Sequence, residues 1–418
     1  MKKERIIDSM SRESYVKYSF PSGFTLVHYP KKGRFLKAAY LSVGFGSTDL
    51  QGNFMGKPFS IPEGTAHFLE HKLFEGEEDL FEKMSRLGAS VNAFTSHDLT
   101  CYYFNTPIHF QASLDLLLQI PIKPGYTRPG VIKERNIIAH EIKMYQDDVD
   151  YHTYHKGLSY LYPKHPVGRD IAGSLESLER IDKDVLDFAV KSYYVPSNML
   201  LFIIGDFSEN EIQNTIETLP RFYLDKKPSA QSFYPEEEND LSHQRLISHQ
   251  DISTASFSYL IKLPASESRM AGFNKSINYT IILDFLFGEG SAFYTHHYEK
   301  GDFLDFSADY SYGPGYGVIS LSGEGRSPFI LEEAIASCLD KPKIANEEKI
   351  LRVKRRLMGR YLMGFNSLSG IAGNFTFLHH RGVDLFNYLP LMEKTLVSSD
   401  GHLFKGASCF SLTMKESL

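Results

Sequence analysis

Apolar and polar residues alternate in two different ways along the first half of the chain. Strict alternation or short continuous apolar runs, which are typical of β-strands, occur at 24–29, 38–45, 90–95, 99–104 and 199–204. Apolar residues spaced three or four apart, which mark one face of a helix, occur at 66–74, 79–87, 108–120 and 131–146. Strands and helices in this order predict an α+β unit.

The same two patterns begin again after a stretch that is rich in charge, serine and proline. Residues 226–243 show no apolar periodicity, and this composition is typical of a linker. Beyond it, strand-like runs occur at 255–262, 305–312 and 317–321, and helical spacing occurs at 277–287. This order loosely repeats the first half. We therefore expect two similar α/β-sandwich domains, each a sheet covered by helices, at 1–225 and 244–418.

Length and composition narrow the class of protein. With 418 residues the chain is too long for one ordinary core, which agrees with two domains. Its 42% apolar and 23% charged residues are typical of a globular protein. A net charge of -6 provides no general basic surface, so we expect no nucleic-acid partner. Three cysteines (Cys101, Cys338 and Cys409) are too few for a disulfide framework, and we expect buried thiols.

The charged N-terminal residues and the length of the apolar runs indicate the cellular location. The first residues, Met1–Asp8, are charged and lack the apolar core of a secretory signal. An apolar run such as Met199–Gly205 is far too short to span a bilayer and predicts a buried strand. We therefore expect a cytoplasmic protein with no membrane partner.

A short stretch that ends at His71 contains the clearest chemical signal. Gly64 interrupts the preceding structure, and we expect Thr65 to be the N-cap of the helix that follows. On that helix His67 and His71 lie one turn apart on one face, where both imidazoles can reach one cation. Glu70 is near the same face and can take a proton from whatever the cation polarises.

A third ligand has to come from elsewhere, because catalytic zinc usually has three protein ligands and one open position. Glu134 and Glu141 are seven residues apart in a predicted helix, so they face the same way two turns apart. One of them can bind the metal while the other supports the site. The spacing does not show which carboxylate is the ligand.

The stretch Gly64–His71 resembles the inverted zinc motif (His-x-x-Glu-His) of the pitrilysin, insulysin and mitochondrial processing peptidase family, the inverzincins. The resemblance continues in order through Leu87–Ser96, Tyr102-Tyr103, Lys133–Glu141, His165–Arg169 and Tyr193–Met199. It covers most of the first half of the chain, which is far more specific than a five-residue match. The subgroup that the sequence resembles most is that of the bacterial YmfH-like peptidases.

The resemblance implies a zinc metalloendopeptidase with one zinc ion per chain. It assigns His67, His71 and Glu141 as zinc ligands. It also assigns the two catalytic carboxylates, Glu70 as the general base and Glu134 as the residue that supports the site. Zinc lowers the pKa of bound water toward about 7, so that a base can take its proton at neutral pH.

The resemblance also implies how the substrate is held. In this family an extended peptide adds to a sheet edge, and the matching segment here is Asn92, Ala93, Phe94 and Thr95. Backbone pairing reads no side chains, which suits an enzyme with loose sequence preference. The alternative is that these residues form an ordinary strand.

One feature of the family is missing from this sequence. Single-chain members carry an arginine and a tyrosine, seven residues apart, in the half without the zinc motif. The matching stretch, His296–Phe306, contains no arginine and has Tyr298 and Asp305 at the two positions. The chain also has about half the length of those four-domain members, so the resemblance implies half of a clamshell. We expect a paralogous subunit that supplies the Arg/Tyr pair in a heterodimer, or a second copy in a homodimer.

Other functions and other sites remain open on the sequence alone. A non-catalytic scaffold homologue and a maturase of one precursor peptide are the alternative functions, although scaffold relatives usually lose motif residues that are all present here. His152, His155 and His165 lie among tyrosines and prolines and predict packing. The adjacent pairs at 296–297 and 379–380 diverge on a helix and are poor chelates.

Overall fold

The computed structural model describes residues 1–74, 80–237, 243–250, 252–326, 328–340, 347–397 and 408–416. These residues form two compact units. The first contains Met1–Ile142, Asp170–Phe233 and Gly364–Arg381, and the second contains Lys143–Arg169, Tyr234–Met363 and Gly382–Leu418. The units therefore interleave along the chain. The predicted domains, 1–225 and 244–418, are based on a repeated order of elements in the sequence. The two packing units do not test that repeat, so these domain boundaries stay a prediction.

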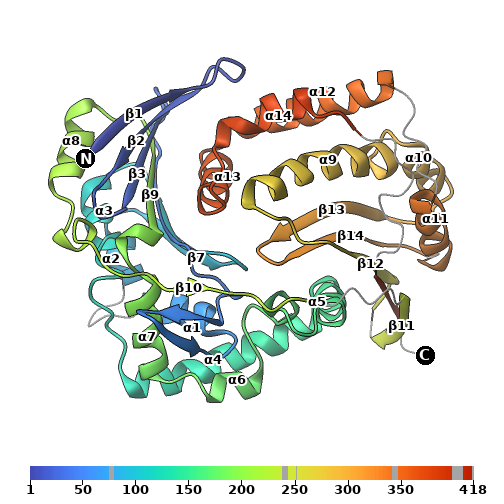
Figure 1. Ribbon diagram of the computed structural model, residues 1–418, viewed down its shortest axis with the longest axis horizontal. Helices are drawn as coiled ribbons and strands as arrows, with labels where there is room; N and C mark the ends of the chain where they lie inside the picture. The colour runs from blue at the N-terminus through green and yellow to red at the C-terminus, as the bar shows by residue number, and fades with distance from the viewer. Residues whose placement is uncertain are drawn as a thin grey trace. The chain divides into compact units, whose positions relative to one another are not determined.

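A seven-stranded mixed sheet forms the centre of the first unit (Figure 1). Its order is β1-β2-β3-β9-β4-β8-β7, and β3 and β9 pair in parallel while the other neighbours are antiparallel. Every residue of β9 is buried, which explains its continuous apolar run. Its strands are β1 (Lys2–Ile7), β2 (Ser14–Ser19), β3 (Thr25–Pro30), β4 (Lys37–Val43), β7 (Ser90–Thr95), β8 (Thr100–Thr106) and β9 (Met199–Gly205).

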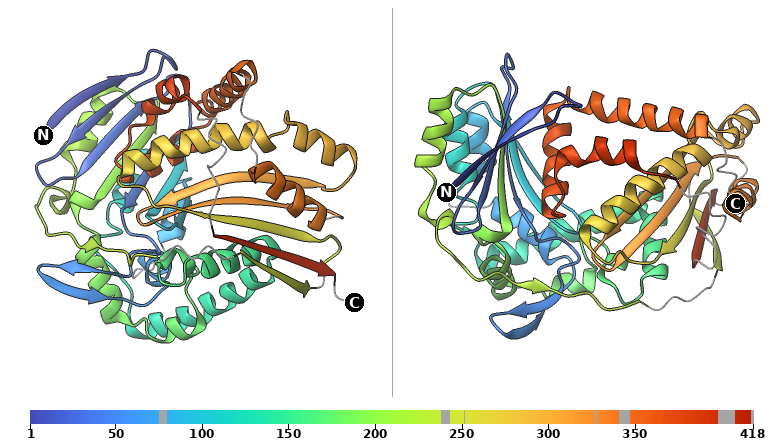
Figure 2. Two further views of the ribbon diagram at one scale, coloured as in Figure 1. Left: turned by 45° about the vertical axis from the view of Figure 1, so that its right-hand side comes forward. Right: turned by 45° about the horizontal axis from the view of Figure 1, so that its top comes forward.

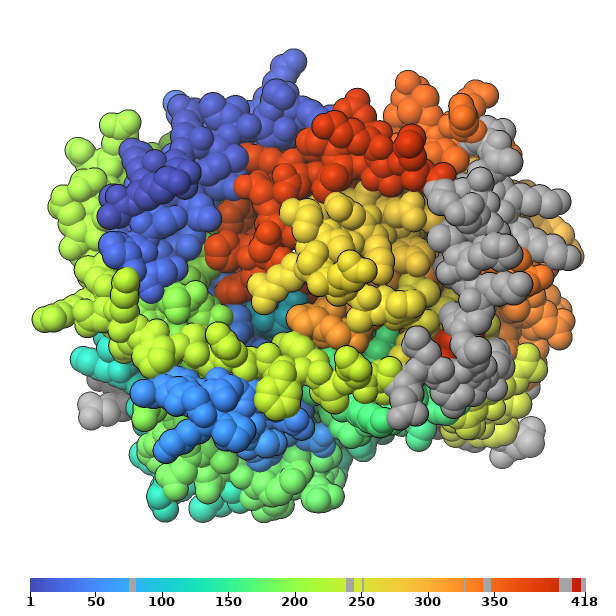
Figure 3. All heavy atoms as spheres, in the orientation of Figure 1, coloured from blue at the N-terminus to red at the C-terminus, as the bar shows by residue number. Residues whose placement is uncertain are grey.

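Helices cover both faces of this sheet. Helices α1 and α3 pack on β8, and α13 packs on β4 and β9 against the opposite face (Figures 1 and 2). The strand at one margin, β1, is almost wholly exposed and lies on the surface with β2 (blue in Figure 3). The helices are α1 (Thr65–Leu73), α2 (Leu80–Arg86), α3 (Phe110–Leu117), α4 (Arg128–Asp147, which continues into the second unit), α6 (Leu175–Glu179), α7 (Lys183–Tyr193), α8 (Glu209–Glu217) and α13 (Leu368–His380).

A small three-stranded sheet of order β10-β5-β6 also belongs to the first unit. Strands β5 (Gln51–Phe54) and β6 (Lys57–Ser60) form a hairpin, and β10 (Gln231–Ser232) pairs with β5. Strand β10 lies inside the predicted linker 226–243, so this part of the linker is ordered structure. Residues 238–242 of that linker lie outside the described residues.

The second unit is also a sheet with helices against it, and the α+β prediction is confirmed. Its five-stranded sheet has the order β11-β15-β12-β14-β13, in which β13 is an edge strand. The strands are β11 (His243–Gln250), β12 (Ser256–Leu263), β13 (Asp305–Gly313), β14 (Tyr316–Glu324) and β15 (Cys409–Glu416). The helices are α5 (Val149–Leu161), α9 (Arg269–Phe287), α10 (Ala292–Glu299), α11 (Pro328–Asp340), α12 (Glu347–Gly364) and α14 (Tyr388–Lys394).

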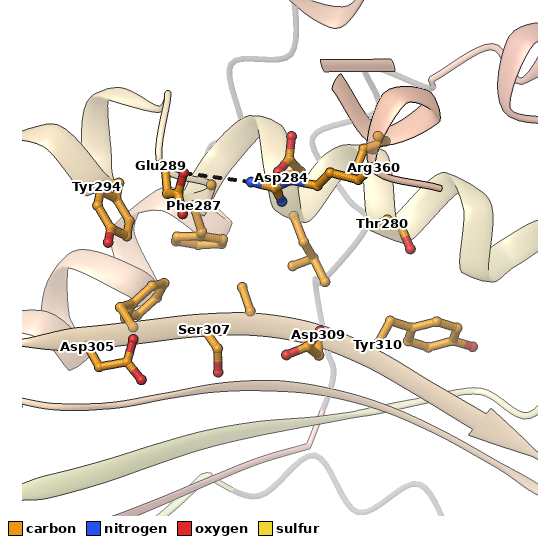
Figure 4. Close-up of a pocket in the computed structure, with 15 residues that line it drawn as sticks. Thr280, Asp284, Phe287, Glu289, Tyr294, Asp305, Ser307, Asp309, Tyr310 and Arg360 are labelled. Carbon is orange, nitrogen blue, oxygen red and sulfur yellow. Dashed lines mark ion pairs between the residues drawn. The ribbon is translucent and has the colours of Figure 1, made fainter. Parts of the chain in front are cut away.

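A cavity of about 350 Å³ lies between α9 and β13 of the second unit (Figure 4). Asp284 of the helix and Asp305 and Asp309 of the strand line it, and burial raises the pKa of the Asp309 carboxyl. The Arg360 guanidinium lies 3.7 Å from Glu289 and 3.9 Å from Asp284, and Arg356 forms a closer ion pair with Asp284. The cavity is therefore lined by both carboxylates and apolar side chains.

The predicted elements match the observed ones in type, and the differences are at their ends. The predicted helix at 277–287 begins earlier, at Arg269, because Ser268 caps the backbone N–H of Ala271. The predicted helix at 79–87 is observed as Leu80–Arg86. Among the described residues, no helix is both long enough and apolar enough to cross a membrane.

Candidate metal centre

Helix α1 begins at a glycine that no other residue could replace without strain. Gly64 has a φ of 83°, and a Cβ at this position would lie 2.4 Å from the carbonyl oxygen of Ala172. The prediction that Thr65 is the N-cap is wrong, because Gly64 has that place and Thr65 is the first helical residue. The Thr65 hydroxyl donates a hydrogen bond to the Pro62 carbonyl (2.6 Å) instead of accepting one from the helix.

Three side chains converge beside this helix. The Nε2 atom of His67 lies 3.6 Å from Glu141 Oε1, and the Nε2 atom of His71 lies 3.4 Å from Glu141 Oε2. One ligand atom from each residue lies within 4.8 Å of the other two. In the part of the chain that the structure describes, this is the group of histidine, cysteine and acidic side chains able to hold a metal ion.

The geometry and chemistry of this group fit zinc. Two ligands at about 2.1 Å from a tetrahedral zinc ion lie roughly 3.4 Å apart, close to the two nitrogen–oxygen separations observed. Two imidazoles and one carboxylate are a donor set that catalytic zinc sites use. The Nδ1 atom of His67 is buried and has no hydrogen-bond partner among the described residues, so its Nε2 atom is the nitrogen that faces the group.

Glu134 orients the second imidazole. His71 Nδ1 donates to Glu134 Oε1 (3.0 Å), which leaves Nε2 facing Glu141. The Nζ atom of Lys72, which is fully buried, donates to the other Glu134 oxygen (3.2 Å). Burial would raise the pKa of Glu134, but the hydrogen bond from His71 and the charge of Lys72 outweigh it and lower that pKa.

The same neighbours act on the imidazole of His71. Burial alone would lower the pKa of His71, but the hydrogen bond to Glu134 and the negative charges of Glu70 and Glu141 together raise it. The site is thus a concentrated negative charge around two imidazoles. Such an arrangement favours a cation, either a proton or a metal ion.

Helix α4 brings Glu134 and Glu141 to the site through its buried stripe. Val131, Glu134, Ile138 and Ile142 are its buried residues, and their spacing of three or four follows one helix face. Glu141 lies at the margin of that stripe, with 21% of its side chain exposed. The stripe fixes the rotation of α4, so both carboxylates face α1.

The carboxylate of Glu70 lies next to the edge of the large sheet. It accepts a hydrogen bond from Thr95 Oγ1 (2.8 Å) at the end of β7. Thr95 and Glu70 are thus held together although they are on different elements. Thr95, predicted as a substrate residue, contacts the predicted base directly.

The other three predicted substrate residues are on the same edge strand. Within the described residues, strand β7 pairs with β8 alone, so its other side has no strand partner there. Asn92 is exposed, and its Oδ1 atom accepts the N–H of Ala93 (2.8 Å). This N–H is therefore directed away from the ladder with β8. Phe94 is half-buried and stacks on Phe377 of α13.

Other residues considered in the sequence analysis lie outside the three-residue cluster, and His165 is bonded to backbone groups. His165 is fully buried, with Nε2 2.9 Å from the Pro314 carbonyl and Nδ1 accepting the N–H of Val167. Tyr298 is 58% exposed on α10, and Asp305 is the first residue of β13.

Sequence reasoning did not single out Lys72. A lysine directly after the motif, in a helix with few exposed positions, is the signal that could have indicated a buried charge partner.

Comparison with known protein families gives two matches. The profile described as insulinase (peptidase family M16) matches residues 61–174, which contain the cluster. The profile described as the peptidase M16 inactive domain matches residues 180–350. The first match thus includes the three clustered side chains, and the second lies C-terminal to them.

Individual relatives give the same result over longer stretches. The uncharacterized zinc protease YmfH of Bacillus subtilis (strain 168) is 33% identical over 387 residues, 89% of each chain. The crystal structure of an M16-like peptidase from Alicyclobacillus acidocaldarius has a TM-score of 0.90 at 28% identity and covers 100% of this chain and 99% of that one. The periplasmic protease PqqL from Escherichia coli shares the fold at 16% identity (TM-score 0.72), with 99% of this chain matching 48% of that chain.

Proposed function

Since this chain belongs to the insulinase family of peptidases (peptidase family M16), we propose that it is the catalytic subunit of a zinc-dependent endopeptidase. Its substrates would be peptides or unfolded polypeptide segments. The observation that carries the proposal is the convergence of His67, His71 and Glu141, with Glu70 beside them. The name of the YmfH relative, a zinc protease, agrees with this choice of metal.

Each side chain of the site has a separate task in the proposed reaction. His67, His71 and Glu141 would hold the ion, which when bound supplies a Lewis acid and makes water acidic enough to lose a proton near neutral pH. Glu70 accepts that proton and delivers it to the leaving amine nitrogen. Glu134 keeps the His71 ring in the tautomer that leaves Nε2 free.

The free side of β7 is the proposed binding edge for the substrate backbone. It ends at Thr95, which contacts Glu70, so a peptide paired with this strand would pass the base. Asn92 holds the outward N–H of Ala93 in the free chain, and a substrate carbonyl would have to replace the Asn92 oxygen. Pairing with a strand edge requires an extended backbone, so it favours unfolded segments over folded proteins.

A second subunit is part of the proposal. The His296–Phe306 stretch contains no arginine to help bind substrate or stabilise the developing oxyanion. The chain also corresponds to about half of PqqL, a single longer chain. A paralogous subunit with the Arg/Tyr pair would supply what is absent here, and a second copy of this chain would not.

A scaffold homologue is the alternative of a different class. It would need neither the Glu70 carboxylate nor the orientation of His71 by Glu134, and both are present. A maturase of one precursor peptide would use the same chemistry with a narrower substrate range.

The test compares wild type, Glu70→Gln and Glu141→Gln, each measured for bound zinc and for hydrolysis of an unstructured fluorogenic peptide. Glu176→Gln, on the exposed side of α6, is the matched control. We expect Glu70→Gln to keep its zinc and to lose turnover by at least about 100-fold, the scale of general-base catalysis. We expect Glu141→Gln to lose most of its metal, because it lacks one of three ligands.

Two results would contradict this proposal. Peptide hydrolysis that persists in Glu70→Gln would exclude Glu70 as the base. A wild-type chain that binds no zinc, with or without the paralogue, would favour the scaffold.

A further inference from the structure

Helix α13 belongs to the first unit, although the chain on both sides of it belongs to the second. Residues up to Met363 and from Gly382 onward pack in the second unit, and Gly364–Arg381 pack in the first. The buried side of α13 lies against β4 and β9 (Figures 1 and 2). Phe375 fixes it there, because its ring packs against Tyr15 and Phe202, at centroid distances of 5.1 and 4.7 Å.

The C-terminal end of this helix contacts the turn between β7 and β8. Arg381 Nε donates to Asp98 Oδ2 at 2.8 Å, and only 25% and 14% of the two side chains are exposed. The other Asp98 oxygen accepts the Ser96 hydroxyl (3.1 Å) inside the same turn. A charge-assisted hydrogen bond with this little exposure is worth more than an ordinary surface pair. Arg381 therefore stabilises the β7–β8 turn through a contact from a different element of the first unit.

A second contact lies one helix turn earlier. The rings of Phe377 and Phe94 stack, with centroids 5.8 Å apart and planes inclined by 22°. Close to them, the His380 Nε2 atom lies 2.8 Å from Ser42 Oγ on β4. Helix α13 thus contacts both the edge strand and its turn through separate side chains.

Strand β7 transmits these contacts to the catalytic side of the sheet. Phe94 and Thr95 are adjacent, so their side chains point to opposite faces. Phe94 meets α13 on one face, and Thr95 donates to Glu70 of α1 on the other. The strand therefore lies between the two helices. Because Phe94 and Thr95 are adjacent, a displacement of the backbone at Phe94 also displaces Thr95.

We propose that Arg381 and Phe377 are positioning residues for the β7–β8 hairpin and, through Thr95, for the carboxylate of Glu70. The catalytic part of this inference rests on the proposed function. The structural part does not, because it concerns how firmly residues 90–106 are held. Helix α13 lies far downstream of the first unit's other elements in the sequence, and the chain at both of its ends belongs to the second unit. The proposed positioning of the site therefore depends on a distant segment of the chain.

Amide hydrogen exchange of the zinc-loaded chain tests the structural part without any turnover. We expect Arg381→Gln to speed exchange in residues 90–106 by at least about fivefold, because this little-exposed pair should contribute no less than the strongest exposed ion pairs do. Exchange in β1–β2 should stay unchanged. Arg381→Lys keeps the charge and should restore much of the protection. Lys37→Gln is the control, since it breaks an ion pair with Glu211 at the other end of β4, where 20% and 47% of the two side chains are exposed.

Peptide hydrolysis then tests the catalytic part. In Arg381→Gln we expect kcat to fall by about tenfold or more, with zinc content unchanged, because small displacements of a catalytic group have effects of this size. Asp98→Asn should have the same effect, and the double variant should be no worse than either single variant. Phe377→Leu, which keeps an apolar contact, should have a smaller effect of the same kind.

Two results would overturn the proposal, and a third would contradict the proposed function alone. Exchange in 90–106 that matches the wild type or the Lys37→Gln control would remove its structural basis. Faster exchange with unchanged kcat would show that α13 holds the hairpin without positioning Glu70. Faster exchange in a chain that never hydrolyses peptide, even with the paralogue, would contradict the proposed function and leave the hold of α13 on the hairpin intact.

Discussion

The buried ion pair of Glu134 and Lys72 supports the imidazole of His71. Lys72 is fully buried, and Glu134 is 6% exposed, so each needs the other to offset the loss of hydration. Glu134 also accepts from His71, which couples the charge of the pair to the tautomer of a proposed ligand. The Glu134 carboxylate thus joins α1 to α4, and in the proposed site it would also support the affinity for metal.

This double role makes Glu134→Gln informative. The amide keeps an acceptor for His71 but removes the negative charge, so we expect zinc affinity to fall by about 10- to 100-fold. We also expect the free energy of unfolding of the metal-free chain to fall by about 3 kcal/mol, because a buried lysine loses its counter-charge. Zinc-chelator competition and urea denaturation measure the two effects.

Glu179→Gln is the control for this substitution, because the Glu179 side chain is 76% exposed in its pair with Arg135. Its unfolding free energy should change by less than about 0.5 kcal/mol. A wild-type zinc affinity in Glu134→Gln would show that Glu134 does not support the metal.

Helix α13 also carries a half-buried histidine, His379, whose surroundings favour the neutral form. Burial, with smaller contributions from the nearby charges of His380 and Lys17, lowers the pKa of His379 to about 3 from 6.5. Between these two pH values the unfolded chain binds a proton at this residue that the folded chain does not. The free energy of unfolding therefore decreases as the pH falls through this window.

We expect His379→Leu to weaken that pH dependence. The leucine cannot bind a proton in either state, so the slope between pH 4 and pH 6 should be smaller by up to about 1.4 kcal/mol per pH unit. Urea denaturation at several pH values measures it, and above pH 7.5 the two curves should run parallel. Equal slopes in the acid window would mean that His379 becomes protonated within the folded protein.

At the scale of the molecule, the described residues contain one proposed zinc site, in the first unit. The profile described as the M16 inactive domain covers residues 180–350, which include the end of the first unit's sheet and much of the second unit. The second unit has its own sheet, edge strand and acidic cavity, but within its described residues no group like that of His67, His71 and Glu141 occurs. The proposed division of labour assigns metal and base to this chain and the oxyanion contacts to a partner.

This division predicts weak hydrolysis by the purified chain with full zinc. Adding the paralogue should raise kcat/KM by about 100-fold or more, the scale of one lost oxyanion donor. A paralogue variant without its arginine should bind this chain equally well, by analytical ultracentrifugation, and give no such increase. Robust hydrolysis by this chain alone would contradict the need for a partner.

The sequence by itself determined the local parts of this protein. The periodicity of apolar residues predicted nearly all the strands and helices considered, and the spacing of His67 and His71 placed both imidazoles on one helix face. These features depend on residues within a few positions of one another, whose geometry the backbone fixes. The resemblance to the inverzincins, now confirmed as membership of family M16, came from the same local motifs.

Only the tertiary structure decided the long-range parts. The spacing of Glu134 and Glu141 left their roles open, and packing brings Glu141 to both imidazoles and Glu134 to Lys72. That β7 is an edge strand and that α13 joins the first unit also depend on contacts between segments far apart in the chain. Periodicity shows which face of an element is buried, but its partner is set by how all the elements pack together.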